Sequence, residues 1–98
     1  MPPTFETSGP FQRDYEKLDR TQRERFKNKV RDEFVPAVRA GNFPAGLRVK
    51  AVEGAPGVYE MTWAPNGRAT WHYGPEVTPG ERHVIWRRVG THDTFGRP

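Results

Sequence analysis

The sequence VYEMTWAPNGRATWHY, residues 58–73, contains two strand-like runs on either side of Pro65-Asn66-Gly67. In both runs apolar and polar side chains alternate, which is the pattern of a strand with one buried face. An Asn-Gly pair between two such runs is a strong signal of a β-hairpin. We therefore predict two antiparallel strands, Val58–Trp63 and Arg68–Tyr73.

Two further runs with the same period of two flank this hairpin. We predict a strand over Leu47–Val52, which ends at the turn-forming sequence EGAPG. A last strand is predicted over Arg82–Val89, after a loop that contains two prolines and two glycines. Together the four strands form an antiparallel meander. Thr4–Thr7 is a candidate for an additional short strand near the N-terminus.

The segment before the meander has the spacing of helices. Gly9-Pro10 breaks the chain and opens a helix, because proline is favoured in the first helical turn. Three apolar side chains follow at helical spacing, Phe11, Tyr15 and Leu18. Thr21-Gln22-Arg23-Glu24 has the form of a capping box, which predicts that a second helix starts there.

The second predicted helix has one apolar face. Its large apolar side chains recur every four residues and share one side of the helix: Phe26, Val30, Phe34 and Val38. Pro36 should kink or end the helix, since proline donates no hydrogen bond and crowds the preceding turn. Gly41-Asn42 should terminate what remains. We expect one α+β domain over residues 1–98, with an N-terminal helical hairpin packed on a small antiparallel meander.

Composition restricts the classes of function. The net charge is +4 and the cationic residues are mostly arginine, which favours polyanionic partners, although a codon bias would also raise the arginine count. The absence of cysteine excludes disulfides and zinc–thiolate sites. No apolar run approaches the roughly 20 residues of a membrane span, and the N-terminus does not have the pattern of a signal peptide. We expect a cytoplasmic protein without a membrane partner.

Alternation divides the predicted sheet into two faces. The apolar face should pack under the helices: Leu47, Val49, Ala51, Tyr59, Met61, Trp63, Ala69, Trp71 and Tyr73. The opposite face should carry Arg48, Lys50, Glu60, Thr62, Arg68, Thr70 and His72. Such a cationic face can bind nucleic acid through its phosphates. An ordinary solvated face of an antiparallel sheet has the same pattern, so this reading stays open beside the first.

The last strand carries Arg87 and Arg88 and leads into Gly90-Thr91-His92-Asp93. In a regular strand the two arginines point to opposite faces, so only one of them can join the polar face. The sequence does not decide which. Histidine transfers protons near neutral pH, which makes His92 a candidate acid or base. A turn cap with Asp93 is an equally simple role for it.

The order of a short strand, a helical hairpin and a meander resembles the RelE/ParE superfamily of bacterial toxins, most nearly its RelE and HigB branch. The segments that carry the resemblance are Leu47–Lys50, Val58–Met61 and Gly90–Asp93, and it extends roughly from Phe11 to Phe95. It implies the toxin of a type II toxin–antitoxin pair, a ribosome-dependent mRNA endonuclease that inhibits translation and is held inactive by a cognate antitoxin protein.

Other functions fit the same resemblance. The ParE branch implies a toxin that binds DNA gyrase and is not a nuclease. An inactive family member and a general nucleic-acid-binding module are further alternatives. The sequence also departs from the RelE branch, which tends to have basic groups where this chain has Glu60 and Thr62.

The resemblance places the catalytic surface on the concave polar face of the sheet. Attack of a ribose 2′-hydroxyl on the adjacent phosphate needs an acid, a base and cations, and requires no metal or cofactor. We assign His92 and Glu60 to proton transfer, although Glu60 would also suit an ion pair with a neighbouring cation. Cations at the reacting phosphate are Lys50 and Arg68. Contacts to RNA phosphates are expected from Arg48, Thr62, His72, and Arg87 or Arg88.

Overall fold

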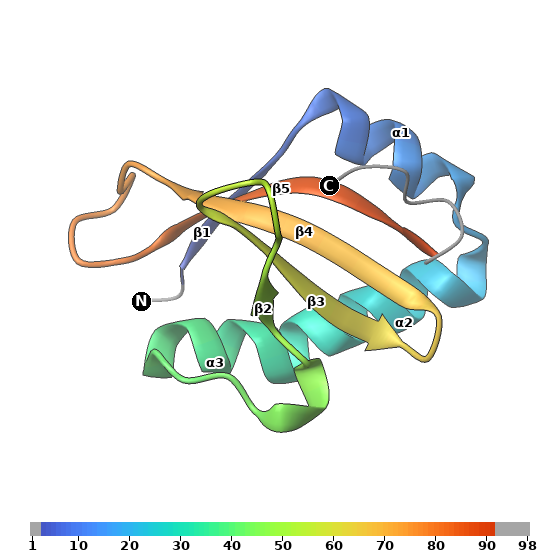
Figure 1. Cartoon of the computed structure of the whole chain (residues 1–98), viewed down its shortest axis with the longest axis horizontal. Helices are drawn as coiled ribbons and strands as arrows, with labels where there is room; N and C mark the ends of the chain where they lie inside the picture. Colours follow the sequence, from blue (N-terminus) through green and yellow to red (C-terminus); the bar gives the residue numbers. More distant parts are fainter. Residues whose placement is uncertain (1–2, 92–98) are drawn as a thin grey trace.

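The computed structural model describes residues 3–91, which form a five-stranded sheet covered by helices (Figure 1). The strands are β1 (Thr4–Thr7), β2 (Lys50–Ala51), β3 (Val58–Ala64), β4 (Gly67–Gly74) and β5 (His83–Thr91), in the spatial order β1-β5-β4-β3-β2. The helices are α1 (Gly9–Lys17), α2 (Arg20–Lys29) and α3 (Val35–Ala40). The predicted α+β class is confirmed. β1 pairs with β5 in parallel, so the sheet is mixed.

The two helix starts use local caps. Ser8 caps α1 by accepting a hydrogen bond from the Phe11 amide, and Pro10 lies in the first turn, as predicted. α2 starts at a capping box made by Asp19 and Gln22. The prediction that Thr21 and Glu24 form this box is wrong, because the chain turns helical two residues earlier, directly after α1 ends at Lys17.

Pro36 neither ends the helical rod nor breaks it. A π-helical turn over Val30–Phe34 joins α2 to α3, and the Val35 amide donates to the carbonyl of Val30, five residues back. Pro36 then falls in the first turn of α3, where its missing N–H is not needed. α3 ends at Gly41, whose φ of 75° is left-handed, so the predicted stop at this glycine is confirmed.

The predicted strand Leu47–Val52 is largely absent. Ala45–Leu47 form a 3₁₀ turn, Arg48 takes a left-handed conformation with φ 49°, and only Lys50–Ala51 pair with β3. A left-handed residue cannot continue a strand, so the run divides there. Leu47 is fully buried from the 3₁₀ turn, whereas Ala51 is exposed, so the predicted apolar face of this strand is wrong.

The core is dominated by aromatic rings from the sheet and the helices. Trp71 of β4 is fully buried, and its ring lies 4.8 Å from that of Phe34 and 5.9 Å from that of Trp86, measured between centroids. The core cluster also contains Phe11, Leu18, Phe26, Val38, Leu47, Met61, Trp63, Ala69, Val84 and Val89. The predicted apolar sides of β3 and β4 are therefore confirmed, with Tyr59 and Tyr73 half-buried at one end. Within residues 3–91, no helix has both the length and the apolarity that a membrane span needs.

Gly67 is required by the packing of the predicted hairpin. A Cβ atom on Gly67 would lie 2.6 Å from ring carbons of Trp63, which is almost completely buried. We expect Gly67→Ala to lower the free energy of unfolding by roughly 1–3 kcal/mol, since the ring has no room to move. Urea denaturation measures this. Gly46→Ala is the matched control, because a Cβ there meets no atom within 4 Å. Equal stability of the two variants would contradict this account.

Candidate functional site

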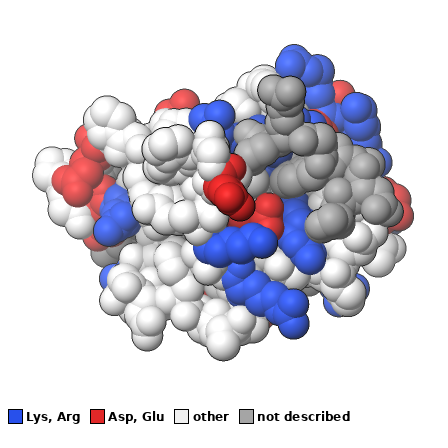
Figure 2. All heavy atoms as spheres, viewed as in Figure 1, with Lys and Arg blue, Asp and Glu red and all other residues white. Residues whose placement is uncertain are grey.

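The strand register aligns four polar residues in a row across the sheet. Lys50 lies opposite Glu60, Glu60 opposite Thr70, and Thr70 opposite Arg88. Directly opposed residues of antiparallel strands share a face, so these four residues, here called the polar row, lie on the side opposite the core. In the view of Figure 2, basic and acidic side chains meet near the middle of the surface.

Glu60 lies between two cations of the polar face. One of its carboxylate oxygens is 3.8 Å from Lys50 Nζ and 3.9 Å from Arg68 Nε. Both contacts are therefore ion pairs, but they are too long to be hydrogen bonds. Arg68 is fixed by the hairpin turn, where its Nη1 donates to the carbonyl of Gly67 at 3.0 Å. Glu60 is thus a carboxylate flanked by two positive charges on the polar face.

Arg87 is the extra residue of a β-bulge in β5. Trp86 is paired with Trp71 and Arg88 with Thr70, so Arg87 has no partner in β4. Arg87 follows Ile85 on the polar side by alternation, and Arg88 faces Thr70 on that same side. The expectation that the two arginines point to opposite faces assumed a regular strand and is wrong. The apolar period resumes at Val89.

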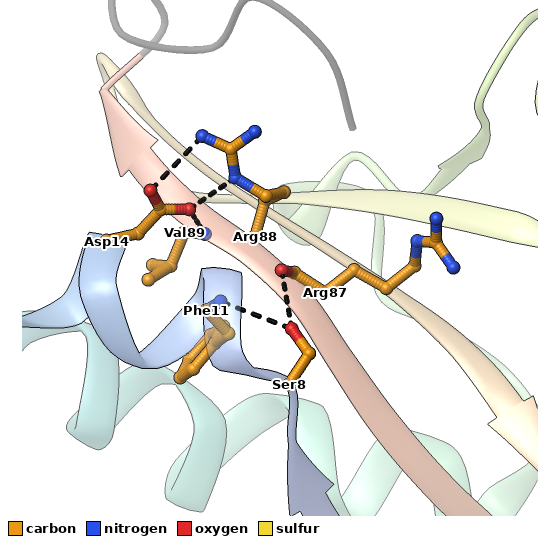
Figure 3. A network of polar contacts seen from close by, with 6 residues as sticks. All are labelled: Ser8, Phe11, Asp14, Arg87, Arg88 and Val89. Atoms are coloured by element: carbon orange, nitrogen blue, oxygen red, sulfur yellow. Dashed lines mark hydrogen bonds and ion pairs between the residues drawn. The ribbon is translucent and has the colours of Figure 1, made fainter.

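Ser8, the N-cap of α1, and Asp14, in the middle of that helix, hold this bulge from the side (Figure 3). Asp14 accepts hydrogen bonds from Arg88 Nε at 2.5 Å, from Arg88 Nη2 at 3.1 Å and from the amide of Val89 at 3.2 Å. Ser8 donates its hydroxyl to the carbonyl of Arg87 at 3.0 Å. We call Ser8 and Asp14 the bulge clamp. Hydrogen bonding to Asp14 raises the pKa of Arg88 above its ordinary value, so Arg88 stays cationic.

Arg87 extends away from Arg88 and toward β4 (Figure 3). Its Nη1 is 3.3 Å from His72 Nδ1. Burial, followed by the positive charge of Arg87, lowers the pKa of His72 below its usual range, with Glu6 acting in the opposite direction. Two buried polar atoms on this face have no hydrogen-bond partner in the described part of the chain, Thr70 Oγ1 and Arg87 Nε.

The structure brings together most of the residues predicted for the site. Glu60, Lys50, Arg68, His72 and both arginines of β5 lie on the polar face, and Thr62 joins them opposite Arg68.

His92 lies outside the described residues. Arg48 is exposed but precedes β2 in a left-handed conformation, so its predicted place on a strand beside Lys50 is wrong. His83 is buried between Thr4 and Glu6, 2.7 Å from an oxygen of each, and links β1 to β5.

The bulge clamp has no clear signature in the sequence. Asp14 is a charged residue in a short amphipathic helix, a pattern that solvated helices share. A trace of the bulge exists in the sequence, because the apolar residues Trp86 and Val89 are three positions apart where a regular strand gives two or four. Among residues 3–91, no three histidine or acidic side chains are placed to hold a metal ion.

The chain matches no protein-family profile and no curated protein. It does match solved structures. A chain of the Escherichia coli DinJ–YafQ toxin–antitoxin complex has a TM-score of 0.69 at 15% identity, and the match covers 99% of this chain and 100% of that one. The YoeB/ParE toxin from Agrobacterium tumefaciens has a TM-score of 0.65 at 14% identity, over 91% and 98% of the two chains.

A chain of the intact E. coli RelBE toxin–antitoxin complex also matches, with a TM-score of 0.57 at 19% identity, over 90% of this chain and 94% of that chain. These identities are low, so the likeness is one of fold. The chain has the fold of the RelE/ParE toxins, which was the fold expected from its resemblance.

Removing the clamp carboxylate tests the support of the bulge. We expect Asp14→Ala to lower the free energy of unfolding by about 2 kcal/mol, because Arg88 and the Val89 amide lose a charged hydrogen-bond partner. Denaturant unfolding measures this. Asp32→Ala removes a carboxylate from the exposed pair with Arg31 and is expected to leave stability unchanged. Equal effects of the two substitutions would contradict a supporting role for Asp14.

The environment of His72 predicts a pH dependence. Because its pKa is lower in the folded state, the unfolded chain binds more protons near pH 6, and stability should fall as pH is lowered through about 6.5. His72→Gln should remove this part of the dependence. In an NMR titration, Arg87→Gln should raise the midpoint of His72, but only in part, since burial is the larger cause. Arg31→Gln serves as the control, and an unmoved midpoint in Arg87→Gln would refute the contact.

Proposed function

We propose that this chain is the toxin of a type II toxin–antitoxin pair and that it cleaves mRNA on the ribosome. The fold supports the toxin role, because structures of this fold include the DinJ–YafQ and RelBE toxin–antitoxin complexes. The observation that supports the nuclease most directly is Glu60, a proton acceptor held between Lys50 and Arg68 on the open face of the sheet.

The proposed reaction is a transfer within the RNA. The ribose 2′-oxygen forms a bond to the adjacent phosphorus while the bond to the 5′-oxygen of the next nucleotide breaks. Glu60 takes the proton of the 2′-hydroxyl, and an acid returns a proton to the leaving 5′-oxygen. Lys50 and Arg68 neutralise the charge that develops on the phosphate. We keep His92 as the proposed acid, since burial and the charge of Arg87 lower the pKa of His72 and so favour its neutral form.

The two arginines of β5 receive different roles in this proposal. Arg88 is held by Asp14, so we assign it to the support of the bulge. Arg87 is assigned to the RNA phosphate, because its guanidinium lies on the polar face and, unlike that of Arg88, pairs with no carboxylate within residues 3–91. Thr62 and His72 line the same face beside it. The proposed partners are the ribosome with its mRNA and a cognate antitoxin, all in the cytoplasm.

The experiment is cleavage of mRNA in an actively translating bacterial extract, read by primer extension. Glu60→Gln keeps the size of the side chain but cannot take a proton, and we expect it to reduce the cleavage rate by about 10²- to 10⁴-fold. Arg68→Ala and His92→Ala should also reduce cleavage and relieve growth inhibition. Glu33→Gln, in the helical pair with Lys29, is the matched control and should cleave normally.

The alternatives give different results in the same experiments. Intact mRNA in the extract, with folded wild-type protein present, would exclude the nuclease. A DNA-damage response in growing cells would instead favour a toxin that binds gyrase. A plain nucleic-acid binder would lose affinity when Arg68 or Lys50 is replaced, in a salt-dependent manner and without any cleavage.

A further inference from the structure

An aromatic cleft opens on the helix-covered side of the sheet, where the end of α3 meets β2 and the adjoining ends of β3 and β4. Its volume is about 320 Å³. Apolar and aromatic side chains form most of its wall, and two cations stand at its rim. We call it the aromatic cleft and define it by six of its lining residues: Phe43, Val49, Lys50, Tyr59, Tyr73 and Arg82.

Lys50 connects this cleft to the polar row. Its side chain lines the cleft, while its Nζ is 3.8 Å from the Glu60 carboxylate. The next pair in the register, Ala51 with Tyr59, also belongs to the cleft. A polyanion that lies along the polar row and passes the edge of the sheet at β2 therefore reaches the cleft at Lys50.

The chemistry of the cleft suits a flat ring attached to an anion. The rings of Tyr59 and Tyr73 lie 5.9 Å apart between centroids and are both half-buried. The guanidinium of Arg82 stands 4.4 Å above the Tyr73 ring. Exposed aromatic faces stack on nucleobases, and guanidinium and ammonium groups bind phosphate. The volume lies at the lower end of the range for small-ligand pockets, which is enough for a single base with its ribose.

We propose that the aromatic cleft binds one base of a single-stranded RNA that continues from the polar row around the β2 edge of the sheet, with Lys50 and Arg82 contacting the flanking phosphates. This inference rests on the proposed function, since it gives the substrate of the polar row a second point of attachment. An acidic peptide with apolar side chains has similar complementarity to the cleft. The nucleotide is favoured because Lys50 belongs to both the cleft and the polar row.

Binding of a non-cleavable RNA tests the cleft without requiring catalysis. The probe is a dye-labelled 2′-O-methyl RNA octamer, followed by fluorescence anisotropy, beside an octamer of the same length that lacks its bases. Tyr59→Leu and Tyr73→Leu should weaken binding of the normal octamer roughly 10- to 100-fold, because a stacking face is lost. Both should leave binding of the base-free octamer unchanged. Tyr59→Phe keeps the ring and should bind as the wild type does.

Arg82→Gln covers the case in which a tyrosine variant fails to fold, since Arg82 is exposed. It should weaken binding of both octamers and reduce the dependence of log Kd on log salt concentration by about one. The proposal would be overturned if Tyr59→Leu and Tyr73→Leu bound the normal octamer as tightly as the wild-type protein does. It would also be overturned if the wild-type protein bound the normal and the base-free octamer equally well. A third contrary result would be an acidic, leucine-rich peptide whose binding depends on the two tyrosines, while the binding of RNA does not. Tyrosine-dependent RNA binding by a protein that leaves mRNA intact would keep the cleft and refute the nuclease.

Discussion

β5 is nine residues long and its backbone needs hydrogen-bond partners along this whole length, but the neighbouring strand β1 is only four residues long. An uncovered strand edge is costly when buried and prone to aggregation when exposed. α1 closes this edge with side chains, because Ser8 and Asp14 bind backbone groups of β5 beyond the end of β1. At the bulge residue Arg87, pairing of β5 with β1 has ended, and hydrogen bonds from the side chains of Ser8 and Asp14 take its place. The placing of both arginines on the polar face follows from it.

Patterns local in sequence predicted the parts of the fold that depend on local chemistry. The hairpin over residues 58–73 and its buried tryptophans follow from alternation and turn residues, and the start of α1 follows from proline placement. The departures have causes that are not local. Arg48 turns left-handed to bury Leu47 under the helices, and the π turn before Pro36 keeps Phe34 against Trp71. Such choices depend on the packed core, which a sequence pattern does not contain.

For the candidate site, too, the sequence predicted which residues share a face but not how they are aligned across the strands. Alternation placed Lys50, Glu60 and Arg68 on one face, and the structure agrees. Their alignment with Thr70 and Arg88 depends on register, which is set by the hairpin turns and by a bulge. The contact of Arg87 with His72 joins neighbouring strands through that bulge, so no spacing rule would have found it. The inserted residue of β5 therefore determines which face Arg87 and Arg88 occupy, which the alternation pattern could not predict.

The order of the strands has a consequence for how the chain folds. Among the strands of residues 3–91, β5 is the last to be synthesised, yet it lies inside the sheet, between β1 and β4 (Figure 1). Within residues 3–91, β1 pairs with no strand except β5, and the loop that closes when Thr4 meets His83 spans most of the chain. Long-range pairing of this kind slows folding and delays it until β5 has been synthesised. A nascent chain that lacks residues 83–91 cannot assemble the polar face, so this face forms only after β5 has left the ribosome.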